Sequence, residues 1–512
     1  MERSNSNLRI GIHWAGFIAG PVLALTCYAL LPDQFTNAAG ETVALAHAGQ
    51  ITLAVMVWMA IWWLTEAVNI TITALLPIVL FPIFGAADIT VATAPYANKI
   101  IFLFAGGFLL ALSMQRWGLD KRIALITLRL VGTKPTNMIL GFMLVTAVLS
   151  AFVSNTATTA MMLPIALSVI ALVCSRQTQE DTADQGQNFA LCLMLGIAYA
   201  ASIGGIATII GTPPNAILVE FIGEYIAEEY QSKISFARWM MIGVPLAAVF
   251  LPITWLLLTR LIYPIRIKQI PGGSALIKNE YNKLGKTSKG EWITFIVFML
   301  AAVCWIFQRN ISSIEFELSE QIFITLEGLT DHVIAMLAAI LLFVIPVDIK
   351  KRTFVMNWDT AKKLPWGILI LFGGGLSLAA AVEANGVAEF LGSQSAAFAG
   401  FPAWIIVLIV IVAVIFLTEL TSNTATTATL VPILAALAPG LGLHPYMLIV
   451  PAAIAASCAF MMPVATPPNA IVFGSGHITI PQMCKAGLWL NIIGIILVML
   501  LAYTIIGTVL GI

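Results

Sequence analysis

The sequence contains very little charge. Of its 512 residues only 10% are Asp, Glu, Lys or Arg, whereas a soluble domain has about 25%. The 25 basic and 25 acidic residues give zero net charge, so the chain lacks the positive excess typical of nucleic-acid-binding proteins. Hydrophobic residues make up 60% of the chain, and its mean hydropathy is +0.97. These values exclude a soluble enzyme and a nucleic-acid binder, and they predict a polytopic membrane protein surrounded by lipid.

Grouped cysteine and histidine residues are also lacking. The six cysteines lie apart, in or beside apolar segments, without a C-x-x-C pair, and the five histidines are scattered. We therefore expect neither a disulfide framework nor a His/Cys metal site. A membrane-embedded enzyme acting on lipid is one alternative, but the sequence offers no Ser/His/Asp set and no pair of acids inside an apolar segment.

Apolar segments of roughly 20 residues, enough to cross a bilayer, are numerous. They predict an all-α membrane protein with about eleven transmembrane helices, at 11–31, 47–66, 67–86, 99–117, 187–220, 236–262, 291–308, 330–347, 366–385, 445–475 and 485–510. Two further apolar segments, 136–175 and 401–440, carry a Ser-Asn-Thr cluster near the middle. We predict that each is a re-entrant hairpin that enters and leaves the membrane on one side.

The distribution of basic residues predicts the orientation, because short cytoplasmic loops are rich in Lys and Arg. With the N-terminus inside, 21 of the 25 fall on the cytoplasmic side, and four fall outside: Lys99, Lys233, Arg238 and Arg309. The predicted location is the cell (inner) membrane, multi-pass, with a cytoplasmic N-terminus. This bias requires both Ser-Asn-Thr segments to be re-entrant, because one more crossing would invert every later loop.

An internal repeat organises the chain. SNTATTA at 154–160 recurs unchanged at 422–428, and TPPNAI at 212–217 recurs at 466–471. The predicted loops give the two copies opposite orientations, and inverted repeats with broken helices are typical of secondary transporters. The predicted domains are an N-terminal span with an outer loop (1–46), a first repeat (47–262), a solvated cytoplasmic linker (263–290) and a second repeat (291–512).

Both repeated motifs predict helix N-termini inside the membrane. Ser, Asn and Thr cap helices, so each SNT turn should start a new helical arm. Pro disfavours helix in the residue before it and suits the first helical position, so TPPN should divide the spans 187–220 and 445–475 into half-helices. The alternative for SNT is that its small polar residues only hold helices together. The alternative for TPPN is a proline kink with a purely structural role. Two identical copies favour a binding site.

The absence of basic side chains indicates the kind of ligand. No Lys or Arg lies within 139–175, 401–440 or 445–475, and Glu419 is the only acid near an SNT motif. Each helix N-terminus carries roughly +0.5 charge, so four converging termini would suit a dianion. Backbone carbonyls at the breaks would suit an alkali cation.

The doubled motifs resemble those of the divalent anion/sodium symporter (DASS, or INDY) family of dicarboxylate transporters, over about residues 50–510. The resemblance implies sodium-coupled symport of C4-dicarboxylates such as succinate, malate and fumarate. It also implies a lipid-embedded homodimer whose transport domain moves against a scaffold domain as an elevator. An antiporter without sodium coupling is the alternative. Exchangers of the family place a basic side chain where sodium would sit, and neither hairpin has one here.

The resemblance also implies binding residues. Substrate would be bound by Asn155, Thr156, Ser422, Asn423 and Thr424, with Thr466 and Pro467 close by. Sodium ions would be bound, partly through backbone carbonyls, by Ser150, Ser154, Asn155 and Gly211 in the first repeat and by Thr418, Asn423, Ala425 and Ala465 in the second.

Overall fold

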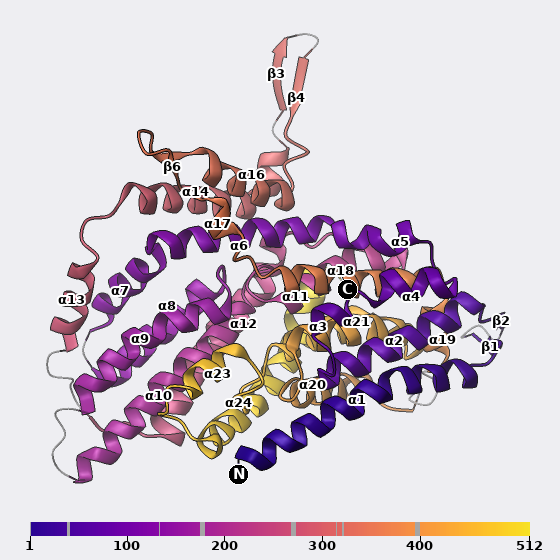
Figure 1. Ribbon diagram of the computed structural model, residues 1–512, viewed down its shortest axis with the longest axis horizontal. Helices are drawn as coiled ribbons and strands as arrows, with labels where there is room; N and C mark the ends of the chain where they lie inside the picture. The colour runs from indigo at the N-terminus through magenta and orange to yellow at the C-terminus, as the bar shows by residue number, and fades with distance from the viewer. Residues whose placement is uncertain are drawn as a thin grey trace.

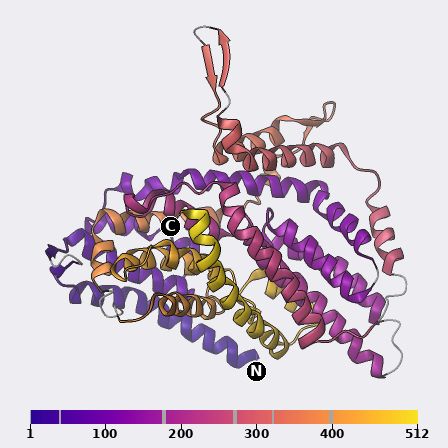
Figure 2. The same cartoon turned by 180° about the vertical axis from the view of Figure 1, so that it is seen from behind.

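The computed structural model describes residues 2–37, 41–132, 134–174, 180–267, 273–313, 315–319, 322–394 and 400–511. The described chain is mostly helical (Figures 1 and 2). Its strands form three small antiparallel pairs: β1 (Gln34–Thr36) with β2 (Thr42–Ala44), β3 (Glu315–Ser319) with β4 (Ile322–Thr325), and β5 (Pro346–Asp348) with β6 (Thr353–Phe354). The prediction of a helical membrane fold is confirmed at this level.

Nine segments of the described chain are helical and apolar over a length that can cross a membrane: His13–Leu30, His47–Thr65, Ile89–Trp117, Asn155–Val173, Gly186–Gly205, Phe236–Ile262, Lys289–Ile306, Trp366–Ala384 and Ile480–Leu510. One of them, Asn155–Val173, is the second arm of a predicted hairpin, so length alone does not define the crossings. The number of eleven crossings and the re-entrant character of the hairpins stay predictions.

The N-terminal region contains α1 (Glu2–Leu30) and α2 (His47–Thr65), which lie side by side, followed by α3 (Ile70–Thr73) and α4 (Leu76–Phe84) (Figure 1). The predicted span at 67–86 contains a turn between α3 and α4, and its crossing of the membrane stays a prediction. Pro77 lies in the first turn of α4, and a proline disfavours helix in the residue before it. The sequence already contained this signal.

The two repeats contain matching elements. In the first, α5 (Ile89–Thr93) and η1 (Ala94–Ala97) lead into α6 (Lys99–Trp117) and α7 (Leu119–Val131). The pair α8 (Pro135–Ser150) and α9 (Asn155–Cys174) follows, and then α10 (Glu180–Gly205), α11 (Pro213–Glu220), η2 (Phe221–Tyr225), η3 (Glu228–Tyr230), α12 (Phe236–Leu256) and η4 (Leu257–Ile262).

In the second repeat, α14 (Lys289–Ile306), α15 (Gln308–Ser312), α16 (Asp331–Val344) and α17 (Trp358–Ala361) precede α18 (Trp366–Ala384) and α19 (Val387–Ser393). The pair α20 (Ala403–Thr418) and α21 (Asn423–Gly440) follows, and then α22 (Tyr446–Ala456), α23 (Pro467–Phe473), α24 (Ile480–Leu501), η6 (Ala502–Ile506) and α25 (Gly507–Leu510). The order α8–α9–α10–α11 thus corresponds to α20–α21–α22–α23.

The predicted breaks at TPPN are confirmed. In the first repeat α10 ends at Gly205 and α11 begins at Pro213; in the second α22 ends at Ala456 and α23 begins at Pro467. Each TPPN therefore starts a short helix after an unwound joint. Each joint exposes backbone groups that a continuous helix would pair internally.

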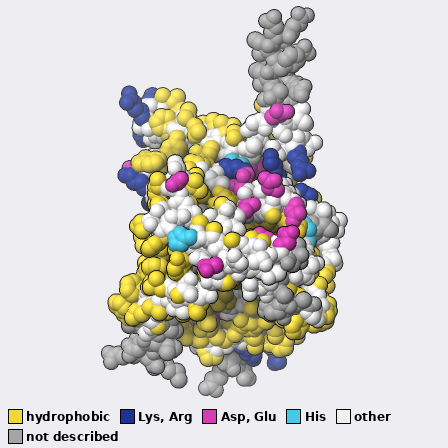
Figure 3. Space-filling view, turned by 90° about the vertical axis from the view of Figure 1, so that its right-hand side faces the viewer, with side chains coloured by type: hydrophobic (Ala, Val, Ile, Leu, Met, Phe, Trp, Pro, Cys, Tyr) yellow, Lys and Arg dark blue, Asp and Glu magenta, His cyan; other side chains and the backbone are white. Residues whose placement is uncertain are grey.

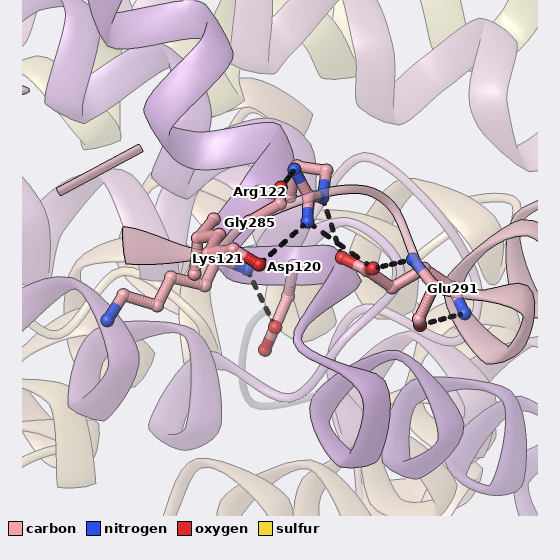
Figure 4. Close-up of polar contacts among 7 residues, drawn as sticks. Asp120, Lys121, Arg122, Gly285 and Glu291 are labelled. Carbon is pink, nitrogen blue, oxygen red and sulfur yellow. Dashed lines mark hydrogen bonds and ion pairs between the residues drawn. The ribbon is translucent and has the colours of Figure 1, made fainter. Parts of the chain in front are cut away.

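The linker between the repeats was predicted to be a solvated loop, but part of it is helical. It contains α13 (Gly273–Lys283), which packs along α7 (Figure 1). Figure 4 shows how Arg122 of α7 is bonded to the linker and to α14. Its guanidinium pairs with Glu291 of α14, with 2.6 Å from Nε to Oε1. Its Nη1 donates to the Gly285 carbonyl of the linker at 3.2 Å. Arg122 and Glu291 are each 5% exposed. Neighbouring Asp120 accepts from the Lys121 backbone N–H instead, and burial raises the pKa of Asp120 to about 6.

The orientation can be tested by cysteine labelling. Lys283 and Lys233 are both exposed, and the charge bias predicts that they lie on opposite sides of the membrane. A membrane-impermeant maleimide added to intact cells is expected to label K233C, and to label K283C only after permeabilisation. The parent chain, with its own cysteines, is the control. Labelling of K283C in intact cells would show that the orientation is wrong.

Candidate functional site

The two SNT turns start helices, as predicted. After α8 ends at Ser150, the Ser154 hydroxyl accepts a hydrogen bond from the Ala157 N–H at 3.2 Å and caps α9. After α20 ends at Thr418, the Ser422 hydroxyl accepts from the Ala425 N–H at 3.5 Å and caps α21. The free N–H groups of each first turn therefore lie at the hairpin tip.

At each tip a hydroxyl oxygen lies close to an asparagine side-chain oxygen and a backbone carbonyl oxygen. The Ser150 hydroxyl contacts the Asn155 side-chain oxygen and lies 2.8 Å from the Ala201 carbonyl oxygen. The Thr418 hydroxyl lies 2.7 Å from the Asn423 side-chain oxygen and 2.9 Å from the Ala456 carbonyl oxygen.

A hydroxyl group has one hydrogen to donate. With the amides oriented as in the structure, that hydrogen cannot fully satisfy both acceptors at either tip. At each tip two acceptor oxygens, one from an asparagine side chain and one from a backbone carbonyl, therefore share a single donated hydrogen. A hard cation bound by oxygens would satisfy the rest, and carbonyl and amide oxygens are ligands of this kind.

In the first repeat the unwound joint approaches the tip closely. A Cβ placed on Gly211 would lie 2.4 Å from the Gly205 carbonyl oxygen and 3.0 Å from the Ala151 carbonyl oxygen, and one placed on Gly205 would lie 2.7 Å from Asn155 Oδ1. Glycine is therefore required where backbone meets backbone. The structure thus brings Ser150, Asn155 and Gly211 of the predicted first sodium site together.

In the second repeat Ala465 occupies the position that corresponds to Gly211. Ala465 and Ala425 are buried, at 7% and 0% exposed. Next to Ala465, the Thr466 hydroxyl accepts from the Asn469 N–H at 3.3 Å and caps α23, whose first residue is Pro467. Two separate hydrogen bonds join Thr418 to Asn423 and Ala425 to Ser422.

The amides of the two TPPN motifs hold the unwound joints in shape. Asn215 Nδ2 lies 3.1, 3.3 and 2.8 Å from the carbonyl oxygens of Gly205, Ile206 and Thr208. Asn469 Nδ2 lies 3.2 and 3.0 Å from those of Ala459 and Met462. Both asparagines are fully buried. The sequence predicted the breaks from the prolines and did not predict these bonds of the asparagines.

The repeats meet crosswise. The arm that follows each SNT packs against the half-helix that follows TPPN in the other repeat, α9 against α23 and α11 against α21. The tips themselves differ, since Thr156 is exposed whereas Thr424 is 9% exposed. Within the described residues no hydrogen bond joins the side chains of one SNT to those of the other.

Glu419 is a residue whose contacts the sequence did not predict. Its side chain is buried at 3% exposure beside the second tip. Oε1 accepts from the Phe460 N–H at 2.7 Å and from Asn491 Nδ2 at 2.8 Å, and Oε2 accepts from the Met462 N–H at 3.0 Å. The corresponding residue of the first repeat is Ala151. The sequence signal was an acid in the second hairpin at a position where the first hairpin has alanine.

Residues between 219 and 230, at the end of α11 and after it, line parts of two cavities of about 600 and 480 Å³. Glu229, Glu383 and Glu389 line the larger, and three of the four basic residues assigned to the outer side (Lys99, Lys233 and Arg309) line the smaller, together with Glu220, Glu224 and Asp331. Figure 3 shows the face of the molecule on which acidic and basic side chains gather beside each other. None of the predicted site residues lines either cavity.

Comparison with known proteins places these features in one family. The sequence profile of the family described as "Sodium:sulfate symporter transmembrane region" matches residues 38–512. A "Sodium-dependent dicarboxylate transporter SdcS" of Staphylococcus aureus strain bovine RF122 / ET3-1 is 43% identical over 498 residues, which are 97% of this chain and 92% of that protein. The protein of the same name from strain NCTC 8325 / PS 47 is 42% identical over the same length.

Solved structures support the fold alone. Neisseria gonorrhoeae MtrF, described as illuminating a class of antimetabolite efflux pumps, superposes with a TM-score of 0.60 at 12% identity and covers 97% of both chains. The Alcanivorax borkumensis YdaH transporter gives a TM-score of 0.58 at 12% identity, covering 96% of this chain and 97% of its own. Both are transporters, but at this identity they carry no argument about the substrate.

Proposed function

This chain belongs to the sodium:sulfate symporter transmembrane region family, that of the divalent anion/sodium symporters, and from this membership we propose that it imports C4-dicarboxylates together with sodium ions across the cell membrane. The family consists of multi-pass membrane transporters, so the chain is a transporter and not an enzyme. Succinate, malate and fumarate are the proposed substrates. A relative that is 43% identical over nearly the whole chain and is named for sodium-dependent dicarboxylate transport supports this choice.

The observation that carries the proposal is the duplicated oxygen cluster at the two tips. Ser150 with Asn155, and Thr418 with Asn423, contact each other and a backbone carbonyl in the same way. We assign one sodium ion to each cluster. The sets are Ser150, Ser154, Asn155 and Gly211 for the first ion and Thr418, Asn423, Ala425 and Ala465 for the second.

The substrate is assigned to the space between the tips, with Asn155, Thr156, Ser422, Asn423 and Thr424 as its hydrogen-bond partners and Thr466 and Pro467 close by. Each asparagine has two functions here, because its side-chain oxygen faces the cation while its NH₂ group donates to a carboxylate. The capped N-termini of α9 and α21 add further N–H donors and positive potential. No basic side chain is then needed to hold the dianion.

Transport is assigned to an elevator movement in a homodimer. In this arrangement α8 to α12 and α20 to α24 form the moving domain, and α1 to α6 with α14 to α18 form the scaffold. The crosswise packing of α9 on α23 and of α11 on α21 supports one moving body that contains both tips.

Uptake by proteoliposomes tests the proposal. Radiolabelled succinate is expected to enter empty vesicles when sodium is outside, and not when choline replaces it. An antiporter would instead need dicarboxylate inside the vesicles and would ignore sodium. Uptake that needs internal dicarboxylate and is equal in sodium and choline would therefore overturn symport.

Substitution of the asparagines tests the site. Asn155→Ala and Asn423→Ala are each expected to weaken succinate binding roughly 5- to 150-fold, about 1–3 kcal/mol, because a buried partner is left unpaired. Calorimetry in saturating sodium measures the loss. Asn282→Ala, the same exchange at an exposed position on α13, is the control and should bind as the parent does. Parent-like affinity in both tip variants would make the SNT tips structural only.

A further inference from the structure

The two hairpins share the heptapeptide SNTATTA at their tips, but only one hairpin carries an acid. Glu419 is the sole Asp or Glu between residues 135 and 174 or between residues 403 and 440. It follows Thr418 directly, and Thr418 belongs to the second oxygen cluster. Ala151, which follows Ser150, occupies the matching position in the first repeat. The second tip therefore has a carboxylate where the first has a methyl group.

In every hydrogen bond described for this carboxylate, the carboxylate is the acceptor. Oε1 accepts from the N–H groups of Phe460 and Met461 at 2.7 and 2.9 Å and from Asn491 Nδ2 at 2.8 Å. Oε2 accepts from the N–H groups of Met461 and Met462 at 3.0 Å each. A protonated carboxyl would donate one bond itself, so this set of donors fits the ionised form. Backbone N–H donors of this kind favour the charged state.

The carboxylate orients the unwound joint that follows α22. The N–H and the carbonyl of one peptide unit point in opposite directions. Since the N–H groups of Phe460, Met461 and Met462 all face Glu419, the carbonyls of these peptide units point away from it. The Ala459 carbonyl, for example, accepts from Asn469 Nδ2 at 3.2 Å. One side chain thus fixes three consecutive peptide units in the joint that also carries Ala465.

The corresponding joint of the first repeat is held differently. There the Thr208 hydroxyl donates to the Ala151 carbonyl, and Asn215 holds three carbonyls. These are bonds between neutral groups. A buried asparagine holds both joints, but only the second joint has a carboxylate beside it.

We propose that Glu419 is a positioning residue of the second cation site, and that its charge makes this site the one that sodium occupies first. The inference rests on the proposed function, because it concerns the sodium ions of that transport cycle. Glu419 acts through the joint and through its electrostatic potential, and it does not itself touch the substrate. A cation at Thr418 and Asn423 gains attraction to a nearby carboxylate in a poorly solvated environment, whereas a cation at Ser150 and Asn155 does not.

The test compares sodium activation of succinate uptake in Glu419→Gln, Glu419→Asp and the parent. Glu419→Gln keeps the size of the side chain and removes its charge, so the sodium concentration for half-maximal uptake should rise roughly tenfold or more. The KM for succinate in saturating sodium should change much less. Glu419→Asp keeps the charge and should stay closer to the parent. Glu220→Gln is the matched control, because Glu220 is also 3% exposed but is the last residue of α11 and lines the smaller cavity, which contains none of the predicted site residues.

The outcomes separate this inference from the proposed function. If the parent itself shows no sodium-stimulated uptake, the proposed function fails. If the parent does, and Glu419→Gln keeps the parent's sodium dependence or shifts only as far as Glu220→Gln, this inference alone is wrong. If Glu419→Gln does not fold, Glu419→Asp decides, since a sodium requirement raised tenfold in a variant that keeps the charge would contradict a role for that charge.

Discussion

Succinate is expected to bind about a hundredfold more weakly in choline than in sodium, close to the upper end of the 1–3 kcal/mol usual for coupling between two sites. The reason is the absence of Lys and Arg from both hairpins. At the proposed site between the tips a dianion would meet helix N-termini and amides, and these would only partly offset the cost of removing it from water. Two bound cations would supply full charges and fix the tips in their capped geometry. Calorimetric titration in the two buffers measures the difference.

The coupling must also be reciprocal, because the free energy is shared between the ligands. Succinate should raise the affinity for sodium by the same factor by which sodium raises the affinity for succinate. Potassium, which is larger, should replace sodium poorly at sites formed by close-packed carbonyls such as those around Gly211. Equal succinate affinity in sodium and choline would refute the coupling and favour the antiporter.

The sequence predicted the parts of the fold that depend on local chemistry. Ser154 and Ser422 cap helices because short hydroxyl side chains reach the N–H groups of the first turn, and the structure confirms both caps. Pro213 and Pro467 begin helices because proline fits the first helical position, and both half-helices begin there. Each of these predictions needed only a few neighbouring residues. Because each motif occurs twice, the sequence also favoured a binding site over a chance cap or kink.

The parts that the sequence did not predict depend on distant partners. Asn491 lies 72 positions from Glu419, and nothing local shows that they meet. Arg122 lies on α7 and Glu291 lies on α14, 169 positions apart, so no local pattern predicts that they pair. The start of α14, directly after the linker, did have a local signal, since Ser288 and Glu291 form a capping box there. The linker was predicted to be solvated, but its helix α13 packs against α7.

The Arg122–Glu291 pair is expected to be among the most sensitive points of the fold. Arg122→Gln should lower the free energy of unfolding by about 3–5 kcal/mol, because it leaves the Glu291 carboxylate buried without a countercharge. It also removes the donors to the carbonyls of Gly285 and Leu284, at 3.2 and 3.4 Å. Thermal unfolding in detergent measures the loss.

Arg129→Gln makes the same exchange on the same helix, at an exposed side chain whose guanidinium lies 5.0 Å from the Tyr281 ring centre. An exposed contact of this kind contributes roughly 0.5–1 kcal/mol, so this control should unfold near the parent's temperature. A buried pair replaced as a whole by apolar side chains is often close to neutral. Arg122→Met combined with Glu291→Leu should therefore recover much of what Arg122→Gln loses. Equal, small effects of the Arg122 and Arg129 substitutions would show that the pair does not hold the linker to α7.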